Sequence, residues 1–280
     1  MGLPMAGNLL QAGYHVQGYD VSQVAMQRFS AMGGQTFETV RQACESSSLL
    51  ILMVVNAEQA RDVLFTQGVI DALSPRAQIC LMATCSPGDV QEIAEQVQSA
   101  GRSLVDCPVS GGVVGAQSAS LTLMVACEEA VFQSLQPVFK ALGQRIYHVG
   151  ETAGQGAMCK TINQLLCGLH IAVAAEAFSL AKKAGLNLEL LLDIMSGSAA
   201  SSWMLKDRGP RMLKADPEVT SAVDIFVKDL GIVRQAGKEF RAALPLTSLA
   251  LEIFTATSGR GLGKSDDSQV IKSFDVLNGV

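Results

Sequence analysis

The chain has 280 residues, 49% of them hydrophobic and 17% charged, so it is long enough and apolar enough to form two compact units with substantial cores. Its net charge of −5 and the lack of a concentrated Lys/Arg stripe argue against nucleic acid as a partner. The apolar stretches are too short or too interrupted to span a bilayer, so no membrane segment is expected. The N-terminus also lacks the pattern of a targeting signal.

The seven cysteines are odd in number and form neither CxxC pairs nor metal-like clusters with the three histidines. This pattern predicts reduced, mostly buried thiols and no metal site. Because thiols stay reduced in the cytosol, we expect a cytoplasmic protein.

Residues 1–150 alternate short β-like runs with amphipathic helical stretches, a pattern typical of an α/β domain with a parallel sheet covered on both faces. Val21–Met32 and Gly88–Ala100 show helical spacing of their apolar residues. The strands that the sequence predicts are Tyr14–Asp20, Leu49–Val55, Gln78–Ala83, Ser103–Pro108 and Leu121–Ala126.

The character of the chain changes after Gly150. Gly154-Gln155-Gly156 precedes a run from Ala157 to about Ala184 without Pro or polar loop clusters, which predicts one long helix ended by Gly185. Further helices are expected at Leu188–Ser196, Ser201–Leu213, Ser221–Arg241, Pro245–Ser258 and Ser265–Leu277. We therefore predict a nucleotide-binding α/β domain at 1–150 and an all-α domain at 151–280, joined by the long helix.

The first candidate site combines Gly2, which begins a helix, with Asp20, which ends the following strand. In dinucleotide-binding folds an acidic residue about 20 positions after the glycine turn binds the adenosine ribose. The charge of Asp20 would favour NAD over NADP, because it repels a 2′-phosphate. An aspartate after a strand is equally often a helix N-cap, so this interpretation stays open.

A second candidate is the segment from Asp106 to Gly112, at the end of a predicted strand. Ser110 is followed by Gly111 and Gly112, which leave backbone N–H groups accessible to an anion such as a carboxylate. A simple Gly-Gly turn is the alternative interpretation.

The third candidate lies on the long helix, where Lys160 and Asn163 are three residues apart and share one face. A lysine and a carboxamide there can hold a hydroxyl oxygen and move its proton. Burial and a positively charged nicotinamide would both lower the pKa of the lysine and make the neutral amine available as a base. A lysine that merely reaches solvent past apolar neighbours is the alternative.

The fourth candidate is the pair Lys228-Asp229 on a helix that begins near Ser221; alone, it is most often an exposed helical face. Asp266-Asp267 more often caps a helix or faces solvent. The sequence contains no Ser-His-Asp set, HExxH motif or EF-hand loop, so hydrolysis and metal catalysis lack candidates.

Together, these four segments resemble the β-hydroxyacid dehydrogenase family over essentially the whole chain. The resemblance implies a Rossmann-type domain followed by an all-α domain, and NAD-dependent hydride transfer from a small hydroxy acid. It assigns catalysis to Lys160 and Asn163, which also contact substrate, and carboxylate binding to Ser110, Gly111 and Gly112. It assigns the cofactor to Gly2, Asp20, Val54, Val55, Thr84 and Lys228.

Two departures from the family pattern qualify these expectations. The glycine turn of the family normally begins upstream of the position of Met1, so the first strand and two phosphate-facing glycines lie outside this numbering. Either the numbering begins late or cofactor binding is weak. Within the family, three segments resemble a subgroup that acts on L-threonate: Ser202-Trp203-Met204, Ser221–Gly231 and Gly263–Ser268. In that subgroup, histidine often stands at the position of Asn163.

L-Threonate, oxidised to its 2-oxo acid, is the substrate that the resemblance favours. 3-Hydroxyisobutyrate and tartronate semialdehyde stay open, as does a non-catalytic relative that keeps the fold for cofactor binding or dimerisation. The apolar faces of an all-α domain predict a homodimer or homotetramer.

Overall fold

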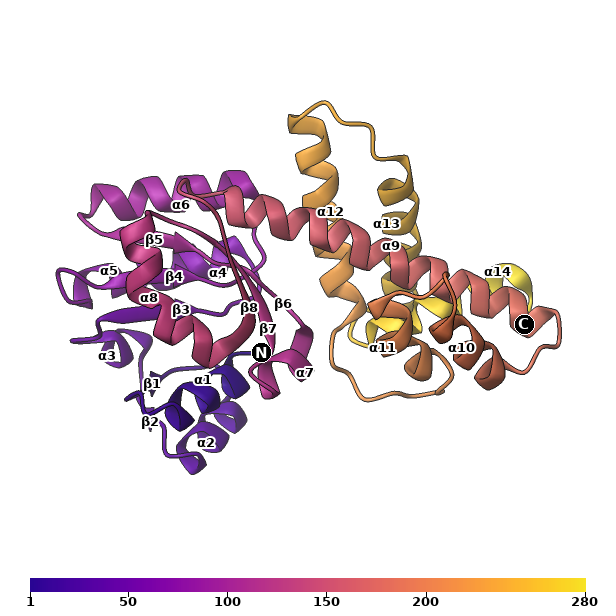
Figure 1. Cartoon of the computed structure of the whole chain (residues 1–280), viewed down its shortest axis with the longest axis horizontal. Helices are drawn as coiled ribbons and strands as arrows, with labels where there is room; N and C mark the ends of the chain where they lie inside the picture. The colour runs from indigo at the N-terminus through magenta and orange to yellow at the C-terminus, as the bar shows by residue number, and fades with distance from the viewer. The chain divides into compact units, whose positions relative to one another are not determined.

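The computed structural model describes all residues from 1 to 280 and divides them into two compact units, Met1–Lys160 and Thr161–Val280 (Figure 1). The long helix α9 (Gln155–Lys183) begins in the first unit and continues into the second. Each unit has a hydrophobic core of its own.

The first unit is an α/β structure, as expected. Its helices are α1 (Gly2–Gln11), α2 (Gln23–Ala31), α3 (Val40–Cys44), α4 (Ala57–Arg61) with the π-helical turn η1 (Asp62–Thr66), α5 (Val69–Ala72), α6 (Pro87–Ser99), α7 (Gly112–Gln117) and α8 (Glu129–Leu142). Its strands are β1 (Gln17–Gly18), β2 (Gln35–Thr36), β3 (Leu49–Leu52), β4 (Gln78–Leu81), β5 (Ser103–Asp106), β6 (Val109–Ser110), β7 (Leu121–Ala126) and β8 (Gly143–Gly150).

The main sheet has the strand order β3-β4-β5-β7-β6, and β8 pairs with β7. The strands β3, β4 and β5 are parallel, whereas β7 runs antiparallel to β5 and β6 antiparallel to β7. The sheet is therefore parallel in its first half and mixed in its second. The strands β1 and β2 form a separate parallel pair.

Several strands are shorter than the sequence predicts. Tyr14–Asp20 contributes only the two residues of β1, because β2 is its single partner strand and is equally short. The prediction missed β2, β6 and β8. The first two have only two residues each, and β8 carries polar residues such as Arg145 and His148 among its apolar ones, which weakens its strand pattern.

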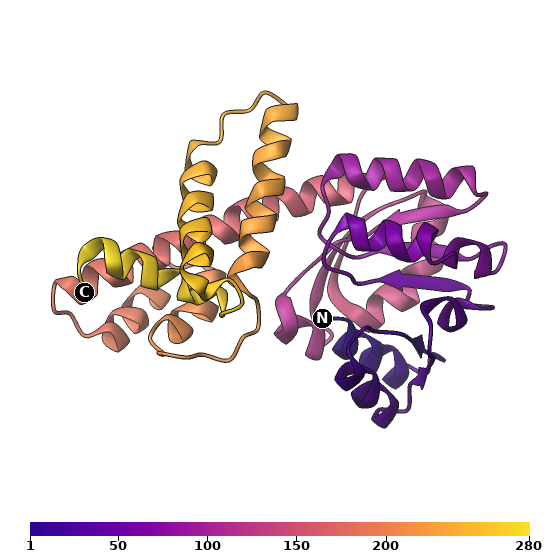
Figure 2. The same ribbon diagram turned by 180° about the vertical axis from the view of Figure 1, so that it is seen from behind.

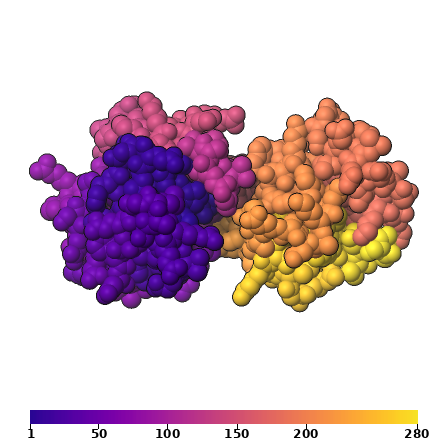
Figure 3. Space-filling view, turned by 90° about the horizontal axis from the view of Figure 1, so that it is seen from below, coloured from indigo at the N-terminus to yellow at the C-terminus, as the bar shows by residue number.

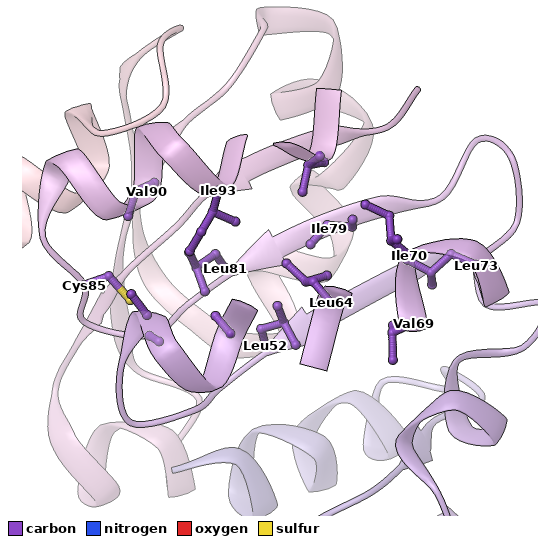
Figure 4. Packing of buried hydrophobic residues seen from close by; sticks show 14 of the residues in the cluster. Leu52, Leu64, Val69, Ile70, Leu73, Ile79, Leu81, Cys85, Val90 and Ile93 are labelled. Atoms are coloured by element: carbon purple, nitrogen blue, oxygen red, sulfur yellow. The ribbon is translucent and has the colours of Figure 1, made fainter. Parts of the chain in front are cut away.

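Helices cover both faces of the main sheet. Side chains alternate along β4, so Ile79 and Leu81 face one core while Cys80 and Met82 face the other. Figure 4 shows Ile79 and Leu81 beside Ile93 of α6 in the first core. Helices α1 and α8 supply side chains to the opposite core.

The second unit is all-helical, as expected. It contains most of α9, then α10 (Leu188–Gly197), α11 (Trp203–Met212), α12 (Val223–Glu239), α13 (Pro245–Thr257), η2 (Ser258–Leu262), η3 (Asp267–Val270) and α14 (Ile271–Asn278). Figure 2 shows α12 and α13 side by side, and Phe226 of α12 stacks on Phe254 of α13. Gly185, with φ of +73°, follows the end of α9 as predicted.

Helix α9 is long and apolar enough to cross a membrane by length and composition alone. Half of its most apolar window is buried inside the structure, and core helices of soluble proteins meet the same criterion. Its buried residues Ile171, Ala175 and Phe178 belong to the core of the second unit.

The expected helix at Ser265–Leu277 is wrong in its first part. Asp266 precedes the short 3₁₀ turn η3 and accepts a hydrogen bond from the Ser268 N–H at 3.2 Å, so it caps that turn rather than an α-helix. Asp267 is fully buried and pairs with Arg208 through both carboxylate oxygens, at 2.7 and 2.9 Å. Asp266 therefore caps the turn η3 and Asp267 binds Arg208 of α11, and neither aspartate faces solvent.

Candidate functional site

The N-terminal segment places Gly2 and Asp20 at different elements of the first unit. Gly2 begins α1, and a Cβ atom there would lie 3.7 Å from Cβ of Met53, just after β3. Asp20 follows β1 and is exposed; its Oδ1 accepts a hydrogen bond from the Ser22 N–H at 2.8 Å. The N-cap of α2 is Ser22, so the alternative role of Asp20 as N-cap does not hold.

An open pocket of about 600 Å³ surrounds Asp20, lined also by Tyr19, Val21 and Glu38. The face of the first unit seen in Figure 3 is built largely from the N-terminal part of the chain, drawn in indigo. The exposed carboxylate of Asp20 is available in this pocket to accept hydrogen bonds from hydroxyl groups.

Val54, Val55 and Thr84 follow two neighbouring strands. Because β3 and β4 are parallel and in register from Leu49↔Gln78 to Leu52↔Leu81, the segments after them leave the sheet at the same edge. The Val55 side chain is 49% exposed. A ring of a bound dinucleotide would have room to pack against this side chain.

Ser110, Gly111 and Gly112 join β6 to the short helix α7. Ser110 pairs with Thr122 of β7, so the sheet holds its backbone. Gly111 and Gly112 have φ of +131° and +62°, conformations that favour glycine. The geometry is thus a constrained glycine turn, compatible with both interpretations offered by the sequence.

Asp106, at the end of β5, fastens this strand to the start of α9. It is 1% exposed, and its Oδ2 accepts hydrogen bonds from the N–H groups of Gly154 at 2.8 Å and Ala157 at 3.0 Å. Burial raises the pKa of its carboxyl group to about 6, while the backbone N–H donors of α9 oppose the rise.

The glycines at the start of α9 permit this close approach. Gly154 has φ of +95°, and a Cβ atom on Gly156 would lie 2.6 Å from the carbonyl oxygen of Met124 and 2.8 Å from that of Asp106. Lys160 follows one turn later and is 7% exposed. The alternative of a lysine reaching solvent therefore does not hold.

In the second unit, α9 and α12 share a chain of polar contacts. The Asn163 Nδ2 donates to Oε1 of Gln164 at 2.8 Å, and the Gln164 Nε2 donates to Oδ2 of Asp229 at 2.5 Å. The other oxygen of Asp229 pairs with the Lys228 ammonium group at 2.6 Å. Asp229 is 2% exposed, so this part of α12 is not the exposed face that the isolated pair suggested.

Two residues of these networks, Asp106 and Gln164, received no role of their own from the sequence, whereas Asp229 entered only as the partner of Lys228 in the fourth candidate. Gln164 lies four positions after Lys160 and so shares its helical face, a signal that could have identified it. Asp106 offered a weaker signal, since an acid at a strand end just before Cys107-Pro108 does not reveal its partner far along the chain.

Two family models match the chain. The model described as the NAD binding domain of 6-phosphogluconate dehydrogenase matches residues 1–150. The model described as NAD-binding of NADP-dependent 3-hydroxyisobutyrate dehydrogenase matches residues 154–274.

Individual relatives are similar over nearly the whole chain. L-Threonate dehydrogenase of Escherichia coli strain K12 is 38% identical over 98% of this chain and 91% of the relative. 2-(Hydroxymethyl)glutarate dehydrogenase of Eubacterium barkeri is 36% identical over 100% of this chain and 93% of its own. A crystal structure of 3-hydroxyisobutyrate dehydrogenase from Salmonella typhimurium superposes with a TM-score of 0.92 at 39% identity, covering 97% of this chain and 95% of the other.

Proposed function

Since the chain belongs to the β-hydroxyacid dehydrogenase family of NAD(P)-dependent oxidoreductases, we propose that it oxidises a small hydroxy acid, with L-threonate as the favoured substrate. The observation that carries the proposal is the burial of Lys160 on α9, one turn after Gly156, which packs against β5 and β7. The similarity to L-threonate dehydrogenases supports the choice of substrate.

Lys160 is the proposed acid/base residue. It would take the proton of the substrate hydroxyl while the carbon that bears this hydroxyl transfers its hydride to the cofactor. Asn163 would orient the hydroxyl oxygen. When bound, the nicotinamide supplies the hydride acceptor. The backbone N–H groups around Ser110, Gly111 and Gly112 would hold the substrate carboxylate.

Gln164 and Asp229 join this proposal as positioning residues. Gln164 contacts the Asn163 amide with one end and the Asp229 carboxylate with the other, which limits the rotation of both. Asp229 in turn fixes the Lys228 ammonium group, for which we propose the contact with cofactor.

NAD is the proposed cofactor in preference to NADP. Asp20 would accept hydrogen bonds from the ribose hydroxyls, and Glu38 adds a second acid to the lining of the same pocket. Both carboxylates would repel a 2′-phosphate. Gly2, Val54, Val55 and Thr84 would complete the cofactor contacts from the segments that follow the strands.

We assign most of the cofactor contacts to residues 1–150, and we assign substrate binding and oligomerisation to residues 151–280, which add Lys228 to the cofactor contacts. Along α9, Ile162, Leu166, Val173 and Leu180 are between 50% and 66% exposed and recur at helical spacing. We propose that a second copy of the chain covers these exposed side chains, giving a homodimer or homotetramer.

The seven cysteines form no disulfide with one another, which supports a reducing, cytoplasmic location.

A panel assay tests the function. The protein would be incubated with NAD and one hydroxy acid at a time: L-threonate, 3-hydroxyisobutyrate, or D-threonate as a stereochemical control. Tartronate semialdehyde would be tested in the reducing direction, with NADH. We expect the highest kcat/KM with L-threonate. If NADH forms with another hydroxy acid but not with L-threonate, that acid replaces L-threonate as the proposed substrate. If no compound of the panel is turned over, the result favours the non-catalytic alternative.

A further inference from the structure

Asp106 is buried at a junction that the proposed mechanism does not use. Its backbone belongs to β5, and the substrate-binding segment of Ser110–Gly112 begins shortly after it. Its side chain reaches the first turn of α9, which carries Lys160. One carboxylate thus joins the segment proposed to hold the substrate to the helix proposed to hold the base.

The contacts of Asp106 are specific to the helix end. Its Oδ2 accepts from the N–H group of Gly154, which precedes α9, and from that of Ala157 in the first turn of the helix. The carboxylate also lies at the positive end of the helix dipole. Oxygen atoms at this position are therefore favoured by the hydrogen bonds and by the dipole, and a side chain lacking them removes one hydrogen bond from each of two buried N–H groups.

The packing around this junction leaves little freedom for α9 to move. Cγ of Asp106 lies 3.0 Å from the position of a Cβ atom on Gly156, so only a glycine fits between the helix and the strand. Asp106 is 1% exposed and Ala157 is 2% exposed, which excludes water as a replacement acceptor without a local shift. The carboxylate and the glycine together set where the first turn of α9 begins.

We propose that Asp106 is a positioning residue for catalysis: by holding the first turn of α9 against β5, it fixes the place of Lys160 relative to the substrate-binding turn at Ser110–Gly112. A shift of the helix start by a fraction of an ångström moves the lysine by a similar distance. Proton transfer requires hydrogen-bonding distance, so such a shift lowers kcat much more than substrate affinity. This inference rests on the proposed role of Lys160.

The test compares Asp106→Asn and Asp106→Ala with wild type. Asn keeps one oxygen acceptor of the same size but no charge, whereas Ala removes both. Asp62→Asn is the matched control, because the Asp62 carboxylate lies in the same unit and accepts from the side chain of Gln67 instead. Steady-state kinetics with NAD and the best hydroxy acid of the panel give kcat and KM, and NAD titration gives the cofactor affinity.

We expect kcat to fall about 10-fold in Asp106→Asn and at least 100-fold in Asp106→Ala, with KM and the NAD affinity changing less than about threefold. Asp62→Asn should match wild type. Equal loss of kcat and of NAD affinity, or a kcat within twofold of wild type in Asp106→Ala, would overturn the inference. Thermal unfolding identifies a variant that is not folded, and Asp106→Asn then carries the test alone.

Hydrogen exchange separates this inference from the proposed function. Peptides that cover residues 150–162 should exchange faster in Asp106→Asn, where the acceptor of the Gly154 and Ala157 N–H groups loses its charge, and faster still in Asp106→Ala, where it is lost. Protection unchanged in both variants would refute the anchor whether or not the wild type oxidises hydroxy acids. Wild-type inactivity with altered exchange would instead refute the proposed function and leave the anchor in place.

Discussion

Gln164 and Asp229 are 65 residues apart in the sequence, yet the carboxamide of one donates to the carboxylate of the other at 2.5 Å, and both side chains are buried. The contact ties α9 to α12 inside the second unit. It also sets the orientation of Gln164, whose oxygen accepts from Asn163. Gln164, which the sequence left without a role, therefore helps to hold the proposed substrate-orienting amide, together with Cys167.

Substitution of Gln164 by Leu tests this relationship. The variant leaves a buried carboxylate oxygen of Asp229 without its Gln164 donor and removes one hydrogen bond of the Asn163 amide, so we expect a loss of about 1–3 kcal/mol in the free energy of unfolding and roughly a 10-fold lower kcat. Urea unfolding and steady-state kinetics measure the two effects. Gln235→Leu is the control, since Gln235 donates to Glu239 on the exposed surface. Equal behaviour of the two variants would refute the positioning role.

Asp20 makes a second prediction, on cofactor choice. Asp20→Ser removes the negative charge that opposes a 2′-phosphate, so the ratio of kcat/KM for NAD to that for NADP should fall at least 10-fold. Glu45→Ser removes one exposed negative charge elsewhere in the same unit and should leave the ratio unchanged. A ratio unaltered by Asp20→Ser would show that Asp20 does not contact the adenosine ribose.

The exposed stripe on α9 predicts an interface between copies. Val173 and Leu180 are 61% and 66% exposed, so their joint replacement by Glu would place two charges in the proposed contact and dissociate the oligomer. Size-exclusion chromatography with light scattering measures the mass. Val219→Glu, at a residue that is 53% exposed outside the stripe, should keep the wild-type mass. A monomeric wild type would contradict the prediction.

The buried carboxyl of Asp106 predicts a pH dependence of stability. Burial raises its pKa from the ordinary value of 3.8 to about 6 in the folded protein. An acid with a raised folded pKa is stabilised in its protonated form, so its contribution is present at low pH and is lost as pH rises through about 6. Between pH 7.5 and pH 5, wild type should gain roughly 1.4 kcal/mol relative to Asp106→Asn, which cannot titrate. Urea unfolding of both proteins at the two pH values measures the difference, and a constant difference would contradict the assignment.

Regular features of the fold were predictable because they depend on nearby residues. The uninterrupted apolar run before Gly185 predicted α9, and the six residues of β7 matched the predicted strand. β8 was missed because its polar residues break the strand pattern, although it pairs with β7 over most of its length. Two-residue strands such as β2 leave no periodicity to detect.

The site was predictable to the extent that its residues lie close together in the sequence. Lys160 and Asn163 share a helical face by spacing alone. The partners that orient them do not: Asp106 meets α9 across 48 residues at Gly154, and Asp229 meets Gln164 across 65. Such contacts depend on how strands and helices pack, which local sequence patterns do not specify.

The kinetics of Lys160→Ala test the central claim most directly. The variant should bind NAD with an affinity within about threefold of wild type, because the lysine acts on the substrate oxygen. Its kcat for the preferred hydroxy acid should fall by about 10³-fold, within the range that loss of a general base produces. A variant that binds NAD normally and keeps most of the wild-type kcat would contradict the account.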